Sequence, residues 1–188
     1  MHQALPGKRR DRVQTKARIL AAAQRAFSEL GYSQVGIRDI AARADVTSPM
    51  LLHYFGSKMG LFEAALVEAI SLRQKIFDGP REDFGRQMMQ LISDPDAEIH
   101  APVLIAMATG DAEAQAVTAR ITKEYAVLPM AEWLGAPDGY ARAVQITLLT
   151  VSYVQFSRQV PLVSPQSDTE RKVIDWMADA IQRIVDRV

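Results

Sequence analysis

The chain is 188 residues long and 48% of its residues are hydrophobic, which supports a sizeable core and excludes wholesale disorder. It contains no Cys, and this excludes disulfides, a thiol nucleophile and cysteine metal ligands. No apolar run approaches the roughly 20 residues of a membrane span, and no signal-peptide core follows the basic N-terminus, so we expect a cytoplasmic protein.

The formal net charge is zero, but the charges are unevenly distributed. Ten of the 22 Lys and Arg residues but four of the 22 Asp and Glu residues fall within residues 1–60. This division indicates a polyanion-binding end joined to an acidic remainder. A disordered basic tail would account for residues 8–12, but not for Arg38, Arg43 and Lys58, which lie in patterned sequence.

The first predicted element is a flexible basic arm, because residues 1–14 show no apolar periodicity. From Thr15, apolar residues recur at helical spacing as far as Gly31, which favours a helix end. Ser48 and Ser57 are N-cap candidates for two of the helices that follow. Three further helices are predicted in this part of the chain: 37–44, 48–55 and 58–77.

The remainder of the chain is also predicted to be helical, with no strand pattern and no internal repeat. Pro129 should kink or interrupt the segment that contains it. We therefore expect an all-α fold of about nine helices. Five of them are predicted beyond Pro80: 81–93, 99–109, 112–134, 138–160 and 168–187.

The helices at 37–44 and 48–55 are joined by three residues, which is the spacing of a helix-turn-helix. Leu51 and Phe55 are four residues apart and point inward together. The other side chains of the second helix then point outward, where this motif enters the DNA major groove. The predicted base-contacting residues are Ser48, Pro49, Met50, Leu52 and His53.

Residues around this helix are expected to meet the phosphate backbone, namely Thr47, Tyr54 and Lys58. Arg9 and Arg10 in the arm would reach a minor groove or follow the phosphates. The alternative is that the helix-turn-helix is only a corner in an all-helical protein.

Residues 15–66 resemble the DNA-binding region of the TetR (tetracycline-repressor-like) family of bacterial regulators. The resemblance rests on several spacings at once: Phe27-x-x-x-Gly31-Tyr32, Ile40-Ala41, Val46-Thr47 and Tyr54-Phe55-x-x-Lys58-x-x-Leu61. By analogy with the family, Arg38 reaches a base or a phosphate; otherwise it is a solvated surface residue.

This sequence also departs from the family's pattern. Gly36 stands where many members have Thr, Asp45 where many have Gly, and Leu52 where Tyr is usual. Met59 and Gly60 replace acidic residues, which weakens the capping box after Ser57. We interpret these departures as an altered sequence preference.

The resemblance implies three parts: a basic arm at 1–14, a DNA-binding domain of three helices at 15–60, and an effector-binding and dimerisation domain at 61–188. Broad apolar stripes on the last two helices favour a four-helix bundle between two copies, the alternative being a buried helix pair in a monomer. The predicted dimer interface comprises Val144, Leu148, Val151, Val173, Met177, Ile181 and Ile184.

Met and aromatic residues of the middle helices suit an apolar effector pocket, although each is equally suited to an ordinary core. Because few charges fall in these stripes, we expect a hydrophobic or aromatic small molecule. The predicted pocket residues are Met88, Met107, Tyr125, Met130, Trp133 and Tyr153.

Two other features are interpreted conservatively. Asp94, Asp96, Glu98 and His100 alternate like metal ligands, but two flanking prolines and no second nearby His favour a solvated acidic loop. The chain has three His and no phosphate-binding or nucleophile motif, so we expect no metal, no cofactor and no enzymatic activity.

The sequence thus predicts a transcriptional regulator, most simply a repressor that binds a palindromic operator as a homodimer and is released by a small effector. An activator remains an alternative within this class. The alternative from another class is a helical small-molecule-binding or enzymatic bundle whose helix-turn-helix is only structural.

Overall fold

The computed structural model describes residues 6–71, 74–94, 101–108 and 110–187, and every regular element in these ranges is helical. The α-helices are α1 (Pro6–Leu30), α2 (Ile37–Arg43), α3 (Ser48–Phe55), α4 (Lys58–Ser71), α5 (Phe84–Ser93), α6 (Ala101–Met107), α7 (Ala112–Thr122), α8 (Leu128–Leu134), α9 (Gly139–Val154) and α10 (Asp168–Val185). Two 3₁₀ turns, η1 (Gln74–Asp78) and η2 (Arg81–Asp83), and two π-helical turns, η3 (Lys123–Val127) and η4 (Gln155–Gln159), connect them.

The predicted flexible arm is wrong from Pro6 onward, because residues 6–14 form the first turns of α1. Residues 11–14 are exposed, so the absence of apolar periodicity reflected a solvated helix. Polar residues such as Lys, Arg and Gln continue a helix readily once its later turns are anchored by burial. Pro6 suits the first helical position. Residues 1–5 lie outside the described part of the chain.

Two further boundaries differ from the sequence predictions. The helix expected at 58–77 ends at Ser71 as α4, and residues 74–78 form the 3₁₀ turn η1. The segment expected at 112–134 is divided into α7 and α8 by η3, which ends two residues before Pro129. The interruption predicted from Pro129 is confirmed, since proline cannot donate the backbone hydrogen bond that a regular helix needs.

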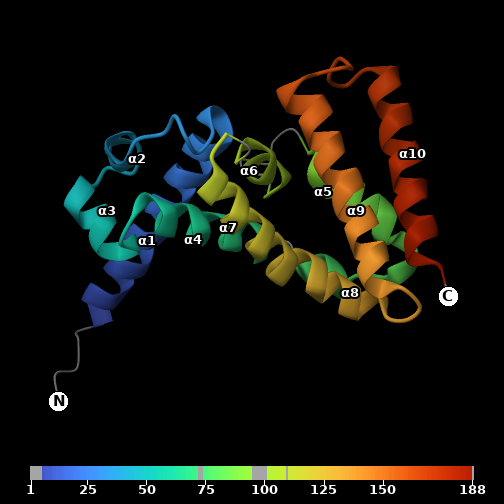
Figure 1. The fold of residues 1–188 in the computed structure, drawn as a ribbon, viewed down its shortest axis with the longest axis horizontal. Helices are drawn as coiled ribbons and strands as arrows, with labels where there is room; N and C mark the ends of the chain where they lie inside the picture. The colour runs from blue at the N-terminus through green and yellow to red at the C-terminus, as the bar shows by residue number, and fades with distance from the viewer. Residues whose placement is uncertain (1–5, 72–73, 95–100, 109, 188) are drawn as a thin grey trace.

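Two clusters of buried side chains hold the helices together. The first is built by α1–α4 with α6 and α7, and it contains the fully buried Ile19, Phe27, Leu51 and Phe62. The second is built mainly by α5, α8, α9 and α10. In Figure 1, α1–α4 lie at one end of the molecule, α9 and α10 at the other, and α6 and α7 between them.

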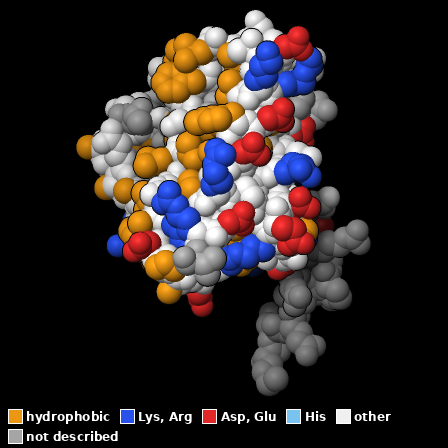
Figure 2. Space-filling model, turned by 90° about the vertical axis from the view of Figure 1, so that its right-hand side faces the viewer, with side chains coloured by type: hydrophobic (Ala, Val, Ile, Leu, Met, Phe, Trp, Pro, Cys, Tyr) orange, Lys and Arg blue, Asp and Glu red, His pale blue; other side chains and the backbone are white. Residues whose placement is uncertain are grey.

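The closest helix crossing in the second cluster depends on a glycine. A Cβ at Gly85 of α5 would collide with the carbonyl oxygen of Ala178 and lie 2.9 Å from the backbone nitrogen of Gln182, both on α10. The backbone N–H of Gly85 donates to the Gln182 side chain at 2.9 Å. The outer face of α9 and α10 leaves large apolar residues exposed, and Figure 2 shows apolar side chains interspersed with charged ones at this end of the molecule.

Candidate functional site

The first helix of the helix-turn-helix, α2, is capped by a carboxylate. The backbone N–H of Gly36 donates to the Asp39 side chain at 3.1 Å. Asp39 therefore supplies one half of a capping box although Gly36 has no hydroxyl for the other half. Ile40 and Ala41 on the opposite face are buried, which fixes α2 against the first core cluster.

The turn between α2 and α3 is closed by a residue in the left-handed region. Asp45 has a φ of 52°, a conformation that Asp tolerates better than most residues. The backbone N–H of Val46 then donates to the carbonyl of Ala41 at 3.0 Å. The departure from Gly at position 45 therefore preserves the tight turn.

Thr47, rather than the predicted Ser48, caps α3. Its side-chain oxygen accepts a hydrogen bond from the backbone N–H of Met50 at 3.3 Å. Leu51 is fully buried, and Gly56, with a φ of 75°, ends the helix. The next helix begins with the predicted cap, because the N–H of Gly60 donates to the Ser57 hydroxyl at 2.9 Å.

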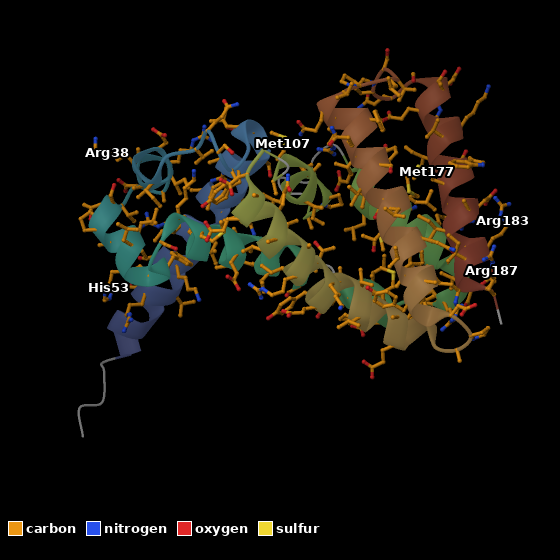
Figure 3. The ribbon with its side chains drawn as sticks, in the orientation of Figure 1. Arg38, His53, Met107, Met177, Arg183 and Arg187 are labelled. Atoms are coloured by element: carbon orange, nitrogen blue, oxygen red, sulfur yellow. The ribbon has the colours of Figure 1, made fainter. Side chains whose placement is uncertain are left out.

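The outward face of α3 has the orientation that the spacing predicted. Met50 and Leu52 are 44% and 39% exposed, Pro49 and His53 are also exposed, and Ser48 is half-buried. Large apolar side chains on an exposed short helix are costly in water and suit a partner surface. Figure 3 shows His53 and Arg38 at this same end of the molecule, on α3 and α2.

Lys58 has a more complex environment than the sequence suggested. Its ammonium lies 4.3 Å from the ring centroid of Tyr32, a cation–π contact. Partial burial lowers the pKa of Lys58, and the carboxylate of Asp111 opposes that shift. Burial, with smaller contributions from Asp111 and Glu113, raises the pKa of Tyr32. A phosphate contact by Lys58 stays a prediction.

The structure says less about the other predicted DNA-contacting residues. Tyr54 is half-buried, and Arg9 and Arg10 lie on α1, with side chains outside the described part. The sequence interpretation did not single out two exposed cations near α3. Lys16 lies 6.0 Å from the Phe55 ring centroid, and Arg18 lies 3.9 Å from Asp45 in the turn. The i, i+4 spacing of Lys16 from Arg12 was the available signal for the first of them.

An apolar cavity of about 90 Å³ lies among α4, α5, α6, η3 and α9. Three of the six predicted pocket residues line it, namely Met88, Tyr125 and Met130. Its polar lining, which the sequence interpretation missed, consists of Gln74, Thr122, Thr147 and Thr150. Hydroxyls on helices are common and carry no sequence signal for a cavity, so these residues could be found only from the fold.

The other three predicted pocket residues do not line this cavity. Trp133 packs against Phe84 with ring centroids 4.6 Å apart and carries the guanidinium of Arg81 over its face. Tyr153 is buried elsewhere and donates to Glu170 at 3.3 Å, and burial followed by Glu170 raises its pKa to about 12. Met107 packs against the second core cluster.

The predicted dimer residues fall into two groups. Met177 and Ile181 are buried within the monomer, so their assignment to an interface is wrong, and Figure 3 shows Met177 inside the bundle. Both belong to the second core cluster, in which α10 approaches α5 closely at Gly85. Leu148 is 62% exposed. The half-buried members of the set are Val144, Val151, Val173 and Ile184.

Within the described residues, no group of three His, Asp or Glu side chains is arranged to hold a metal ion. Of the alternating acidic stretch, Asp96, Glu98 and His100 lie outside the described part. In the same described ranges, no helix has the length and apolar content needed to cross a membrane.

Comparison with known proteins agrees with this architecture. Residues 19–65 match the family described as bacterial regulatory proteins, tetR family. The HTH-type transcriptional regulator RutR of Escherichia coli K12 is 27% identical over 95% of this chain and 92% of its own length. The HTH-type transcriptional activator FasR of Mycolicibacterium smegmatis is 38% identical, but the match spans 32% of this chain and 27% of FasR.

Solved structures show the same fold. A Rhodococcus sp. structure described as of the TetR family superposes with a TM-score of 0.76 at 18% identity, covering 93% of this chain and all of the other. Reduced Escherichia coli NemR superposes with a TM-score of 0.68 at 12% identity, covering 90% and 97% of the two chains. The family match thus covers the helix-turn-helix region, and the chain as a whole shares the fold of these solved structures.

Proposed function

We propose that the chain is a repressor that binds a palindromic operator as a homodimer and is released by a small, predominantly apolar effector. The observation that carries this proposal is the outward face of α3, where Met50, Leu52 and His53 project from a helix anchored by the buried Leu51. In this proposal, residues 15–60 bind DNA and residues 61–188 bind the effector and the second copy.

The chemistry of α3 suits base edges in the major groove. The Met50 and Leu52 side chains would contact thymine methyl groups, and the His53 imidazole would hydrogen-bond to a base edge. The Thr47 hydroxyl accepts from the backbone of α3, so its own proton remains available to donate to a phosphate oxygen. Ser48, beside it, is half-buried at the start of the helix.

Dimerisation is supported by the exposed apolar surface of the opposite end. Leu148 on α9 and Trp176 on α10 are 62% and 58% exposed. Covering such a surface with a second copy would remove apolar area from water at about 25 cal/mol per Å². A two-fold dimer would also present two copies of α3, which successive major grooves require about 34–36 Å apart.

Effector control is supported by the connection that α4 makes. Ile70, near the end of α4, lines the apolar cavity, and Lys58, at its beginning, follows α3 after two residues. Fourteen residues of helix span about 21 Å as a stiff rod. A ligand that displaces the Ile70 end would tilt α4 and change the spacing of the two recognition helices. A typical coupling of about 1–3 kcal/mol is enough to release DNA.

The direct test replaces Met50 and His53 with Ala. Footprinting on the upstream intergenic region first defines the operator, and affinities for operator and random DNA are then measured at one salt concentration. We expect the ratio of the two affinities to fall by about 1–3 kcal/mol per lost contact. Glu82→Ala, an exposed change on η2, is the control. Unchanged affinity and specificity in a folded double variant would contradict the placement of α3.

The direction of regulation needs its own measurement, because one relative is named an activator. Deleting the gene should raise transcription from the footprinted promoter if the protein represses it. A fall in transcription would establish activation instead. No footprint on any upstream region would favour the helical bundle with a merely structural helix-turn-helix.

A further inference from the structure

The apolar cavity is too small for most effectors. Its volume is about 90 Å³, whereas ligand pockets usually measure about 300–1,000 Å³. An apolar cavity of about 150 Å³ holds a single benzene molecule. An effector of ordinary size therefore needs space beyond this cavity.

A second hollow adjoins the cavity. A groove of about 420 Å³ lies between α6 and α7, with η3 and Tyr140 of α9 at its edge. Ile105 of α6 and Thr122 of α7 line both the groove and the cavity. These two side chains therefore form the partition between the two spaces. Both are only partly buried, so a change of rotamer can open the partition without unfolding a helix.

Two residues that line the groove have buried hydroxyls without hydrogen-bond partners among the described residues. Thr118 is 6% exposed, and neither its Oγ1 nor that of Thr122 has a partner among the described residues. The two are four residues apart and so share one face of α7. In contrast, the hydroxyls of Thr147 and Thr150 in the cavity donate to backbone carbonyls at 2.9 and 3.0 Å. Buried polar groups normally have partners, and rotation about χ1 would turn these two hydroxyls toward the oxygen atoms of a ligand in the groove.

The cavity and the groove differ in the charge of the residues that line them. The described residues that line the cavity include no charged side chain, whereas those lining the groove include Lys123. Lys123 begins η3, and π-helical turns are frequent at functional sites. The neighbouring Glu124 is engaged by Arg120 at 3.4 Å. A ligand that occupied both spaces would be apolar where it fills the cavity and anionic where it lies in the groove.

We propose that the groove and the cavity form one ligand channel, interrupted by Ile105 and Thr122, and that the effector is an elongated carboxylate. Its alkyl or aryl end fills the cavity, Thr118 and Thr122 donate hydrogen bonds to its oxygen atoms, and the carboxylate meets the Lys123 ammonium. This proposal rests on the proposed function, because it assumes that the cavity is the effector site.

The first test uses the purified full-length chain without DNA. Octanoate and decanoate are titrated calorimetrically beside 1-octanol and 1-decanol, which have the same chains without the charge. We expect each carboxylate to bind about three- to fivefold more tightly than its alcohol, the most that an exposed ion pair usually contributes. Lys123→Gln should abolish this difference. Lys172→Gln, an exposed change on α10, should leave it intact.

The second test addresses the partition. Thr122→Val keeps the side-chain volume but removes the hydroxyl, and it should weaken carboxylate binding severalfold. Ile105→Trp should block the channel and reduce the affinity for acids and alcohols alike, with an unchanged melting temperature confirming the fold.

Three results would overturn the channel: equal affinities for acids and alcohols, a carboxylate preference that survives Lys123→Gln, or no binding of any probe. Because no DNA is present, these results leave the proposed operator binding unaffected. If the purified protein gave no footprint on any upstream region, the proposed DNA binding would be contradicted, but the ligand titrations would still be valid.

Discussion

Arg142 is a buried cation that holds two helix ends together. It is 2% exposed. One nitrogen of its guanidinium donates to the carbonyl of Arg187 at 2.7 Å, beyond the end of α10. The other donates to the carbonyls of Leu134 and Gly135, at the end of α8, at 3.0 and 2.7 Å. Helix C-termini carry unpaired carbonyls and a partial negative charge, so one guanidinium satisfies both ends.

Replacing Arg142 with Met keeps most of the apolar volume and removes the charge and the donors. Hydrogen bonds to charged groups contribute about 1.5–3 kcal/mol each, and the two 2.7 Å bonds dominate here. The loss is reduced because burying a guanidinium is itself unfavourable, and its Nε has no partner among the described residues. We expect a net loss of about 2–4 kcal/mol, a large part of the stability of an ordinary domain.

Urea unfolding followed by circular dichroism would measure this loss, at one protein concentration because the proposed dimerisation would couple to folding. Arg86→Met is the matched control, since Arg86 is exposed and its ion pair with Asp83 spans 3.4 Å. The control should change stability by less than about 0.5 kcal/mol. If Arg142→Met were equally mild, the carbonyls of α8 and α10 would not depend on this side chain, and the reasoning would be refuted.

Three further predictions test other parts of the structure. Gly85→Ala should destabilise the α5–α10 crossing by about 1–3 kcal/mol because the new Cβ meets the Ala178 carbonyl, and a melting temperature equal to that of the parent would disprove the tight contact. Burial, and then Glu170, raise the pKa of Tyr153 to about 12. The folded state therefore keeps a proton that the unfolded state loses near pH 10. The contribution of Tyr153 to stability is thus present below about pH 10 and is lost between pH 10 and 12. Tyr153→Phe should lose less stability than the parent between pH 9 and 11 in urea titrations, and identical losses would contradict the assignment. Leu148→Glu should give a folded monomer in sedimentation experiments if α9 forms the dimer interface, whereas an intact dimer would exclude this part of α9.

The helix-turn-helix could be predicted from sequence because short-range interactions determine it. The spacing of Leu51 and Phe55, the three-residue turn and the stop at Gly56 each act within a few residues. The orientation of Met50 follows from the burial of Leu51 through helical periodicity alone. Even here, the choice of Thr47 over Ser48 as the cap depended on where the backbone first becomes helical.

The apolar cavity and the exposed outer face of α9 and α10 depend on tertiary structure. An apolar stripe shows that a helix side is covered, but not by what. Met177 and Ile181 proved to lie in the second core cluster, where the glycine at position 85 lets α5 and α10 approach closely although they are distant in sequence. Met88 lines the cavity whereas Met107 packs against the core, although both have the same apolar chemistry. Sequence periodicity determines which side of each helix is buried, and only the packing of distant helices determines whether that side meets a neighbour, a cavity or a second copy.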